Sequence, residues 1–266
     1  MIWIIIAAVG LAIVFILFGL SPMQVPRRYG HEGPETTRSV RDFDRVGRWF
    51  LFVVQRKMIM GGMPEMSPDG FLTDIGCGSG HLTAEVALKY PYMKVAGLDF
   101  DNRMLELARK NWPAPSNGLN FILGDAQNLP FGDNTLDCLV SSLSLHHWKD
   151  APAVFLELHR VLKPGGRLLI WDLRRDAPRF FYYILMFGQA FLAPRSIRQI
   201  NGAIGSFWAS YTSPELKTML QRASFTEIEV QPGFGWTLTH AAKPDQAHFN
   251  KAAPAVIPGP TATTRP

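Results

Sequence analysis

The sequence has few of the residues that build disulfide-stabilised or metal-stabilised proteins. Its 266 residues include only two cysteines, Cys77 and Cys138. Two cysteines cannot form a disulfide framework, and these two lack the paired spacing of a zinc site, so we expect no metal. The globular part is then expected in a reducing, cytosolic compartment. No internal repeat is visible, which argues against a stacked-repeat architecture.

Charged and polar side chains are also absent from residues 2–20, the longest apolar run in the chain. A helix of this length spans roughly 28 Å, close to the thickness of a bilayer core. Pro22 and Pro26 end the run, and the arginines that follow place the C-terminal side in the cytoplasm. A cleaved signal peptide is the main alternative, but no Lys or Arg precedes the run and no A-x-A-like site follows it. We expect a single-pass transmembrane helix and then a linker over residues 21–35.

The rest of the chain, 36–240, alternates strand-like and helix-like patterns. Its first segment, 36–60, has apolar residues at three- and four-residue spacings and predicts one helix. Strands are then expected over 71–75, 94–98, 120–123, 137–141 and 167–172, and helices over 82–89, 102–111 and 151–162. Strands that alternate with helices predict an α/β fold with a doubly wound, mostly parallel sheet and helices on both faces.

Three further elements follow a long insertion at about 174–212. A helix is expected over 213–221 with Ser213 as its cap. Two antiparallel strands over 226–231 and 236–240 bring the sheet to seven strands. The last segment, 241–266, is rich in Ala, Pro and Thr and is expected to be a disordered tail.

The most informative motif is Thr73-Asp-Ile-Gly-Cys-Gly-Ser-Gly80 at the end of the first strand. Because Gly76, Gly78 and Gly80 lack a Cβ, the turn can take positive φ and a ligand can lie against its backbone. A strand, such a turn and a helix start form the first unit of a nucleotide-binding fold. A histidine follows the third glycine, so the spacing is not the G-x-G-x-x-G of dinucleotide enzymes. Asp74 before the first glycine favours a ligand with positive charge, such as S-adenosylmethionine.

Other polar residues stand where the expected strands end, which is where a doubly wound sheet binds its ligand. Asp99 ends the second strand, where a carboxylate can accept both ribose hydroxyls. Asp125 follows the third strand, where it can receive an adenine amino group. Ser141 and Asp172 end the fourth and fifth strands. Together these positions predict a nucleoside site at one edge of the sheet.

The order and spacing of these segments resemble class I S-adenosylmethionine-dependent methyltransferases over about residues 71–173. The segments that carry the resemblance are Thr73–Gly80, Gly97-Leu-Asp-Phe100, Gly124-Asp-Ala-Gln-Asn-Leu-Pro-Phe131, Leu136–Ser141 and Arg160-Val-Leu-Lys-Pro-Gly-Gly-Arg-Leu168. The Leu-Pro-Phe and Leu-Lys-Pro-Gly-Gly sequences are most similar to the small-molecule enzymes of ubiquinone and menaquinone biosynthesis. The resemblance implies a Rossmann-like fold with S-adenosylmethionine as methyl donor. The residues it implies for the donor are Asp74, Gly76, Cys77, Gly78, Gly80, Asp99, Phe100, Asp125, Ala126 and Ser141.

Two adjacent histidines, His146 and His147, are the candidates for a catalytic base. Methyl transfer needs a base only if the attacking atom must lose a proton. Because neighbouring residues point to opposite sides, we expect only one histidine to face the cleft. The alternative is that these side chains only pack or hydrogen-bond within their loop.

The substrate clue is the segment 180–193, which has six aromatic residues and a single polar amide. Three arginines precede it, as expected for a helix at an anionic membrane surface; the alternative is a helix buried against the sheet. Similar enzymes use the insertion after the fifth strand to cover their substrate. With the N-terminal run, the segment favours a lipophilic small-molecule acceptor delivered from the membrane.

Three functions other than small-molecule methyl transfer share part of this pattern. An NAD-dependent oxidoreductase would share the glycines and Asp99 but does not need Gly124-Asp-Ala126. A nucleic-acid methyltransferase would carry an Asn-Pro-Pro-Tyr-type motif for a flipped base, which is absent, so we expect no nucleic-acid partner. A membrane-tethered module that binds S-adenosylmethionine without turnover stays open, because binding residues alone do not prove turnover. The sequence predicts neither the acceptor nor the oligomeric state.

Overall fold

The structure is a computed structural model that describes residues 18–29, 36–113 and 118–245. Nearly all of the predicted transmembrane helix, 2–20, lies outside these residues. Within the three described stretches, no helix combines the length and the apolar character that a membrane span requires.

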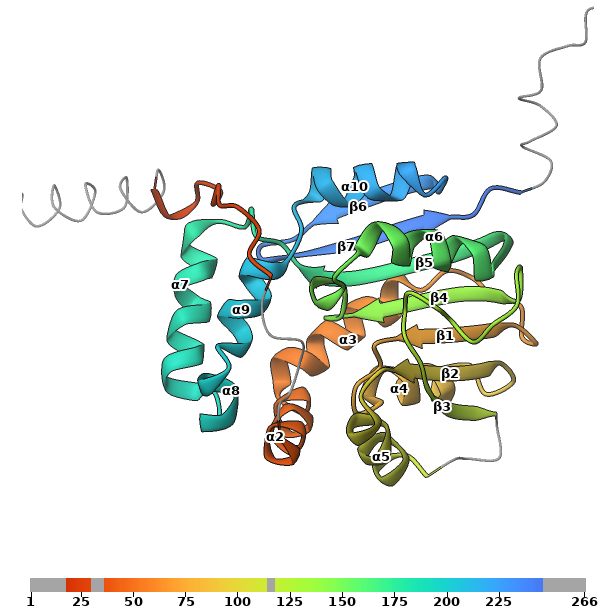
Figure 1. Cartoon of the computed structure of the whole chain (residues 1–266), viewed down its shortest axis with the longest axis horizontal. Helices are drawn as coiled ribbons and strands as arrows, with labels where there is room; N and C mark the ends of the chain where they lie inside the picture. The colour runs from red at the N-terminus through yellow and green to blue at the C-terminus, as the bar shows by residue number, and fades with distance from the viewer. Residues whose placement is uncertain (1–17, 30–35, 114–117, 246–266) are drawn as a thin grey trace, which may run out of the picture.

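A seven-stranded sheet runs through the domain in the order β3-β2-β1-β4-β5-β7-β6 (Figure 1). The strands are β1 (Phe71–Ile75), β2 (Lys94–Asp99), β3 (Leu119–Leu123), β4 (Leu136–Ser142), β5 (Leu162–Leu173), β6 (Thr226–Pro232) and β7 (Trp236–Ala242). The first five are parallel, and β7 pairs antiparallel with both β5 and β6. This arrangement confirms the predicted mostly parallel, doubly wound sheet. We call the edge at which β1 to β5 end the carboxyl edge.

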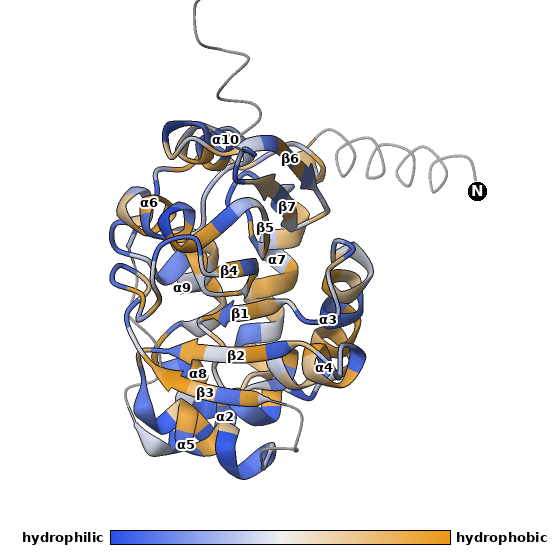
Figure 2. Cartoon of the chain, turned by 90° about the vertical axis from the view of Figure 1, so that its right-hand side faces the viewer, coloured by the Kyte–Doolittle hydropathy of each residue, from blue (hydrophilic) through white to orange (hydrophobic). Residues whose placement is uncertain are grey.

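Helices cover both faces of the sheet because its strands are apolar on both sides. In β4, Leu139 belongs to the apolar core under α6 (Ala151–Val161) and α10 (Ser213–Arg222). Its neighbours Cys138 and Val140 belong to the core on the other face. The helices of that second face are α3 (Phe50–Gly62), α4 (His81–Lys89) and α5 (Asn102–Asn111). Figure 2 shows their apolar and polar sides.

The remaining helices gather beyond the carboxyl edge (Figure 1). They are α2 (Thr37–Gly47), the short turn η2 (Leu145–His147), α7 (Arg179–Phe187), the π-helical turn η3 (Gly188–Leu192), α8 (Arg195–Gln199) and α9 (Gly202–Ala209). Helix α2 contacts α8, and α7 contacts α9. The insertion after β5 therefore forms a helical layer over the edge where a ligand is expected.

The single helix predicted over 36–60 was wrong, because the segment forms two helices, α2 and α3. Helix α2 ends at Gly47, and Trp49 is extended before α3 begins. Glycine disfavours helix continuation. The break also satisfies a carbonyl, since the guanidinium of Arg56 donates to Gly47 O at 2.7 Å. The hydrogen bond between Arg56 and Gly47 O thus accompanies the end of α2, although the apolar spacing continues through this point.

The predicted linker is docked on the insertion over its described part. Pro22 forms an isolated β-bridge with Pro178, and Met23 N donates to Ala177 O at 3.0 Å. Further along, Arg28 N donates to Trp208 O at 3.0 Å. We call residues 18–29 the docked segment.

The predicted boundary of the C-terminal tail also shifts. Strand β7 continues through Ala242, and Lys243 N still donates to Gly166 O at 2.9 Å. Residues 246–266 lie outside the described residues.

The predicted cap of α10 was wrong by one residue. Thr212, rather than Ser213, is the N-cap: its hydroxyl accepts from Glu215 N, and the Glu215 carboxylate accepts from Thr212 N at 2.9 Å. This reciprocal capping box satisfies two backbone donors at once. The hydroxyl of Ser213 is buried and has no hydrogen-bond partner within the described part of the chain.

The two neighbouring hydroxyls should therefore respond differently to removal. Thr212→Ala is expected to lower the free energy of unfolding by about 1 kcal/mol, because α10 loses its cap. Ser213→Ala is expected to change it little, since the lost hydroxyl makes no hydrogen bond. Denaturant unfolding of both variants measures the difference. Equal losses would contradict the assignment of the cap.

Candidate functional site

The glycine loop between β1 and α4 lies at the carboxyl edge. Gly76, Gly78 and Gly80 all have positive φ, as the sequence predicted. A Cβ on Gly76 would lie 2.0 Å from the hydroxyl of Ser144, and one on Gly80 would lie 2.8 Å from the ring of Phe121. A Cβ on Gly78 would meet nothing within 4 Å. Two glycines are thus required by packing, and the third leaves open space against the backbone.

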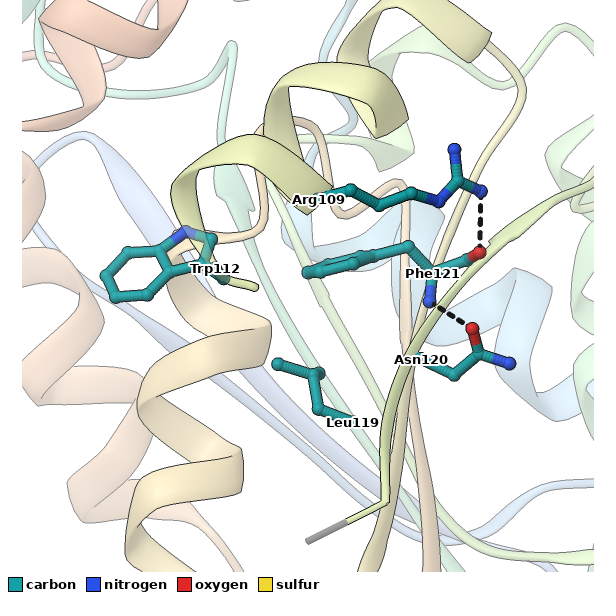
Figure 3. Close-up of a pocket in the computed structure, with 5 residues that line it drawn as sticks. All are labelled: Arg109, Trp112, Leu119, Asn120 and Phe121. Carbon is teal, nitrogen blue, oxygen red and sulfur yellow. Dashed lines mark hydrogen bonds between the residues drawn. The ribbon is translucent and has the colours of Figure 1, made fainter. Parts of the chain in front are cut away.

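The packing behind this loop includes a pocket of about 270 Å³ between α5 and β3 (Figure 3). Phe121 lines it together with Trp112 and Arg109, whose guanidinium donates to Phe121 O at 2.8 Å. The ring of Trp112 also meets His81 of α4 edge to face. None of the five lining residues is acidic. We therefore interpret this pocket as part of the support for the loop, separate from the strand-end acids.

Asp74, the residue before the last of β1, is a buried carboxylate that is only partly satisfied. One of its oxygens accepts from the hydroxyl of Thr83 at 2.7 Å, and the other, Oδ1, is buried and has no hydrogen-bond partner among the described residues. Burial raises the pKa of this carboxyl to about 7. A buried acceptor without a partner costs free energy, so a donor or a cation in the site would stabilise it.

Asp99 at the end of β2 fastens the glycine loop to the sheet. Its Oδ2 accepts from Gly78 N at 2.8 Å, and its Oδ1 accepts from Asp101 N at 2.9 Å. Each carboxylate oxygen can accept more than one hydrogen bond. Asp99 can therefore still accept hydrogen bonds from the two ribose hydroxyls, as the sequence predicts. Burial raises the pKa of Asp99. The next residue, Phe100, is 60% exposed and presents a free ring surface at the same strand end.

Two of the predicted cofactor residues instead direct their side chains into the fold. The hydroxyl of Ser141 is buried and donates to Ile75 O at 2.8 Å, so it joins β4 to β1. The side chain of Cys77 packs toward Gly97 of β2, where a Cβ would lie 2.9 Å from its sulfur. Burial raises the pKa of the Cys77 thiol. These side chains shape the loop, and the prediction that they touch the cofactor is untested.

The predicted adenine segment follows β3 as a turn. Asp125 is exposed, and its carboxylate accepts from Gln127 N at 2.9 Å. Ala126 is half-buried and packs against the apolar core under α6. One carboxylate oxygen of Asp125 makes this turn contact, and the exposed side chain remains accessible to a ligand.

The two histidines lie in η2, directly after β4, and differ in their surroundings. His146 is buried, and its Nδ1 lies 2.7 Å from Oδ1 of Asp172 at the end of β5. The backbone N of His146 donates to the other Asp172 oxygen at 3.2 Å. The ring of His147 is half-buried, and its centre lies 4.1 Å from the ring centre of His146 at an interplanar angle of 45°. In the described stretches no group of three metal-ligating side chains occurs at this or another place.

Sequence reasoning missed the residues that reach this site from distant segments. Arg27 of the docked segment donates to His146 O at 3.4 Å, and its guanidinium lies 4.1 Å from the ring centre of Tyr211. Tyr29 donates to His147 O at 3.0 Å. Gln55 of α3 donates to the hydroxyl of Ser142 at the end of β4. No local signal marks such contacts, because they form only when the chain folds.

Comparison with known proteins decides the family. Residues 73–170 match a family model described as a methyltransferase domain. A 2-phytyl-1,4-naphtoquinone methyltransferase of Nostoc punctiforme is 35% identical over 167 residues, which cover 60% of this chain and 70% of that protein. The chain belongs to the S-adenosylmethionine-dependent methyltransferases.

Other curated relatives match this methyltransferase over a shorter part. A ubiquinone/menaquinone biosynthesis C-methyltransferase of Desulfotalea psychrophila is 34% identical over 53% of each chain. A demethylmenaquinone methyltransferase of Thermotoga maritima is 36% identical over 51% of this chain and 58% of its own. The chain thus spans little more than half the length of these two relatives.

Solved structures share the fold of the methyltransferase. Phosphoethanolamine N-methyltransferase 2 of Haemonchus contortus, in complex with S-adenosyl-L-methionine, has a TM-score of 0.60 and 18% identity. The likeness covers 79% of this chain and 58% of that one. A possible histamine N-methyltransferase of Thermotoga maritima has a TM-score of 0.58 and 20% identity, over 78% of this chain and 97% of that one.

S-adenosylmethionine is the methyl donor of this family, and the site fits it in two ways. The open space at Gly78 lets a ligand approach the loop backbone. The unpartnered Oδ1 of buried Asp74 suits a ligand that carries an ammonium group and a sulfonium. A pyrophosphate would instead place negative charge near Asp74 and Asp99, which disfavours a dinucleotide.

The affinity for S-adenosylmethionine is expected to rise with pH. A cationic ligand favours the ionised form of Asp74, whose pKa is about 7, so affinity should increase about tenfold between pH 6 and pH 8. Asp74→Asn should flatten this dependence. Calorimetric titration of both proteins at several pH values measures it.

A flat profile for the unmodified protein would contradict this role of Asp74. The same raised pKa gives an independent check without ligand. The folded protein keeps a proton that unfolded Asp74 loses near pH 3.8, so the stability due to this group is lost as pH rises toward about 7.

Proposed function

We propose that this methyltransferase transfers a methyl group from S-adenosylmethionine to a small lipophilic acceptor that reaches the site from a membrane. The observation that carries the proposal is the aromatic layer over the carboxyl edge. In it, the ring of Tyr182 in α7 lies 5.3 Å from Phe207 and 5.5 Å from Trp208, both in α9. Helix α9 contacts η2, the turn that holds His146. An aromatic cover next to a donor site suits an apolar acceptor.

The relatives support the same class of acceptor. The curated enzymes named above act, by their names, on naphthoquinone, menaquinone or ubiquinone compounds. These molecules are lipophilic, so a protein of the same family with an aromatic cover is expected to take a related ring compound. The family-model match, residues 73–170, contains the glycine loop, β4 and most of β5, and it ends before the helices of the cover.

The membrane setting is part of the proposal. The uncharged run over residues 2–20 would span the bilayer once and leave the enzyme domain on the cytoplasmic side. Its last residues fall within the described part of the chain. Phe18 and Leu20 are exposed there, at 60% and 47%.

The donor supplies a methyl group that its sulfonium has activated, so the protein chiefly has to align the acceptor and exclude water. Alignment of two reactants is worth about 7–11 kcal/mol in favourable cases. We propose that the glycine loop, in which Gly78 N donates to Asp99, holds S-adenosylmethionine in position for the transfer. The aromatic layer would exclude water on the acceptor side.

His146 is the better candidate for a base. Asp172 holds its Nδ1, which leaves Nε2 as the atom that can take a proton from an acceptor hydroxyl or ring carbon. The backbone carbonyl of His147 accepts from the Tyr29 hydroxyl at 3.0 Å. The histidine–carboxylate pair would thus act in acceptor deprotonation, and Asp172 would be its positioning residue.

The product of the reaction tests the proposal directly. Membranes that contain the full chain should convert isotope-labelled S-adenosylmethionine into labelled lipophilic material. Mass spectrometry of extracted quinones and lipids, with and without the protein, should show one class with a 14-dalton increase, the mass of an added CH₂. Label confined to water-soluble compounds would contradict a lipophilic acceptor. Binding of the donor without any labelled product would favour the non-catalytic alternative.

Substitution of the two histidines separates their roles. His146→Asn should lower turnover about 100-fold or more, because the proton acceptor is lost, while donor affinity stays unchanged. His147→Asn should lower it much less. Turnover with labelled donor and calorimetric donor binding are measured on both variants. A weak effect of His146→Asn, in a protein that still binds the donor, would remove His146 from the reaction.

A further inference from the structure

One apolar surface of the domain is not used by the proposed reaction. It consists of Phe180, Tyr183, Ile184, Phe187, Phe191 and Leu192 of α7 and η3, which we call the α7 face. These side chains are between 37% and 70% exposed, and no residue of α7 is fully buried. The spacing of three and four residues from Phe180 to Phe191 places these five on one side of the helix, and Leu192 follows at its end. An exposed apolar cluster of this kind is typical of a surface that binds another protein or a membrane.

The opposite side of α7 is the one that packs on the domain. The ring of Phe181 lies 6.4 Å from Phe207, and Tyr182 packs on the same ring. Gln189 of η3 is buried, and its side-chain oxygen accepts from Ala203 N at 2.9 Å. Helix α7 stands at the outer limit of the molecule in Figure 1. The α7 face therefore points away from the sheet.

The charge around the α7 face favours an anionic lipid surface. Residues 177–214 contain no Asp or Glu but contain Arg179, Arg195 and Arg198. Arg195 and Arg198 are exposed just after η3. An apolar helix face with basic residues at its ends is typical of helices that lie in the headgroup region of a membrane.

The last residues of the apolar N-terminal run, 18–20, lie at the beginning of α7. Ser21 O accepts from Arg179 N at 3.1 Å, and the guanidinium of Arg179 lies 4.6 Å from the ring centre of Phe18. The residues before Phe18 are the uncharged run. A run that enters the bilayer there brings the start of α7 to the membrane surface. Helix α7 has nine residues and is only about 14 Å long, too short to cross the bilayer itself.

We infer that the α7 face is a bilayer-docking surface, which lies at the boundary between the headgroups and acyl chains of an anionic membrane. This inference rests on the membrane setting of the proposed function and adds a second contact to the N-terminal run. The α7 face would also orient the domain. Because the N-terminal run and the α7 face would both contact the membrane, together they fix which side of the domain faces the lipid. The aromatic layer over the carboxyl edge is then next to the bilayer.

A fluorescent label at single positions of the full chain tests this orientation. The two native thiols are poor labelling sites, since Cys138 is buried with a pKa of about 12 and burial also raises the pKa of Cys77. Phe187→Cys places an environment-sensitive nitrobenzoxadiazole label on the α7 face. Leu88→Cys is the matched control, because Leu88 is 70% exposed on α4, away from α7. Both proteins are reconstituted in vesicles of phosphatidylcholine and phosphatidylglycerol.

The label at position 187 should shift its emission to shorter wavelength and lose most of its intensity when doxyl-labelled lipid is included. The label at position 88 should do neither. Absence of lipid quenching at position 187 would overturn the inference. A blue shift that grows with added unlabelled protein and is insensitive to doxyl lipid would also overturn it, and would assign the face to a second copy of the chain.

Two further measurements distinguish failure of the docking surface from misfolding of the variant and from failure of the proposed reaction. Phe191→Cys, on the same face, repeats the test if Phe187→Cys does not fold. Donor binding by calorimetry on the same vesicles reports on the cofactor site. Lipid quenching without methyl transfer would leave the docking surface standing and remove the proposed reaction. Methyl transfer without quenching would do the reverse.

Discussion

The donor site depends on how the glycine loop is fastened to the neighbouring strand. Three successive backbone N–H groups of the loop bind the end of β2: Gly76 N and Cys77 N donate to Leu98 O, at 2.7 and 3.0 Å, and Gly78 N donates to Asp99. These bonds hold the loop in a conformation that only glycine adopts readily. The backbone is therefore arranged before a ligand arrives, which lowers the entropy cost of binding.

Some features of the structure follow from local sequence patterns, and others depend on contacts that form only on folding. The sequence predicts the first kind and not the second. The parallel strands, the glycine loop and the strand-end acids follow from short patterns of apolar residues, glycine and aspartate, and the structure confirms where they lie. The break between α2 and α3 is accompanied by the hydrogen bond from Arg56 to Gly47 O, and the cap at Thr212 consists of two reciprocal hydrogen bonds with Glu215. The spacing of apolar residues does not predict these details. One helix or two over 36–60, and a cap at Thr212 or at Ser213, have nearly the same apolar pattern.

The proposed acceptor side of the site is assembled from segments that are far apart in the chain. The docked segment, α9 and η2 meet at the histidine turn only after folding, so Arg27 and Tyr29 carry no motif that would mark them. Family membership is shown by the sequence comparisons. The proposed choice of acceptor depends on contacts that form on folding, and for this reason it is argued from those contacts rather than from resemblance.

The docked segment gives the N-terminal part of the chain a second role. Arg175, which is buried, donates to Val25 O at 3.0 Å and to the Glu215 carboxylate, so the segment is connected to α10 as well as to the histidine turn. A shortened protein that begins after Tyr29, made to simplify purification, would lose more than its apolar run. It would also lose the hydrogen bonds of Arg27 and Tyr29 to the backbone of the two histidines, and its inactivity would say nothing about the need for a membrane.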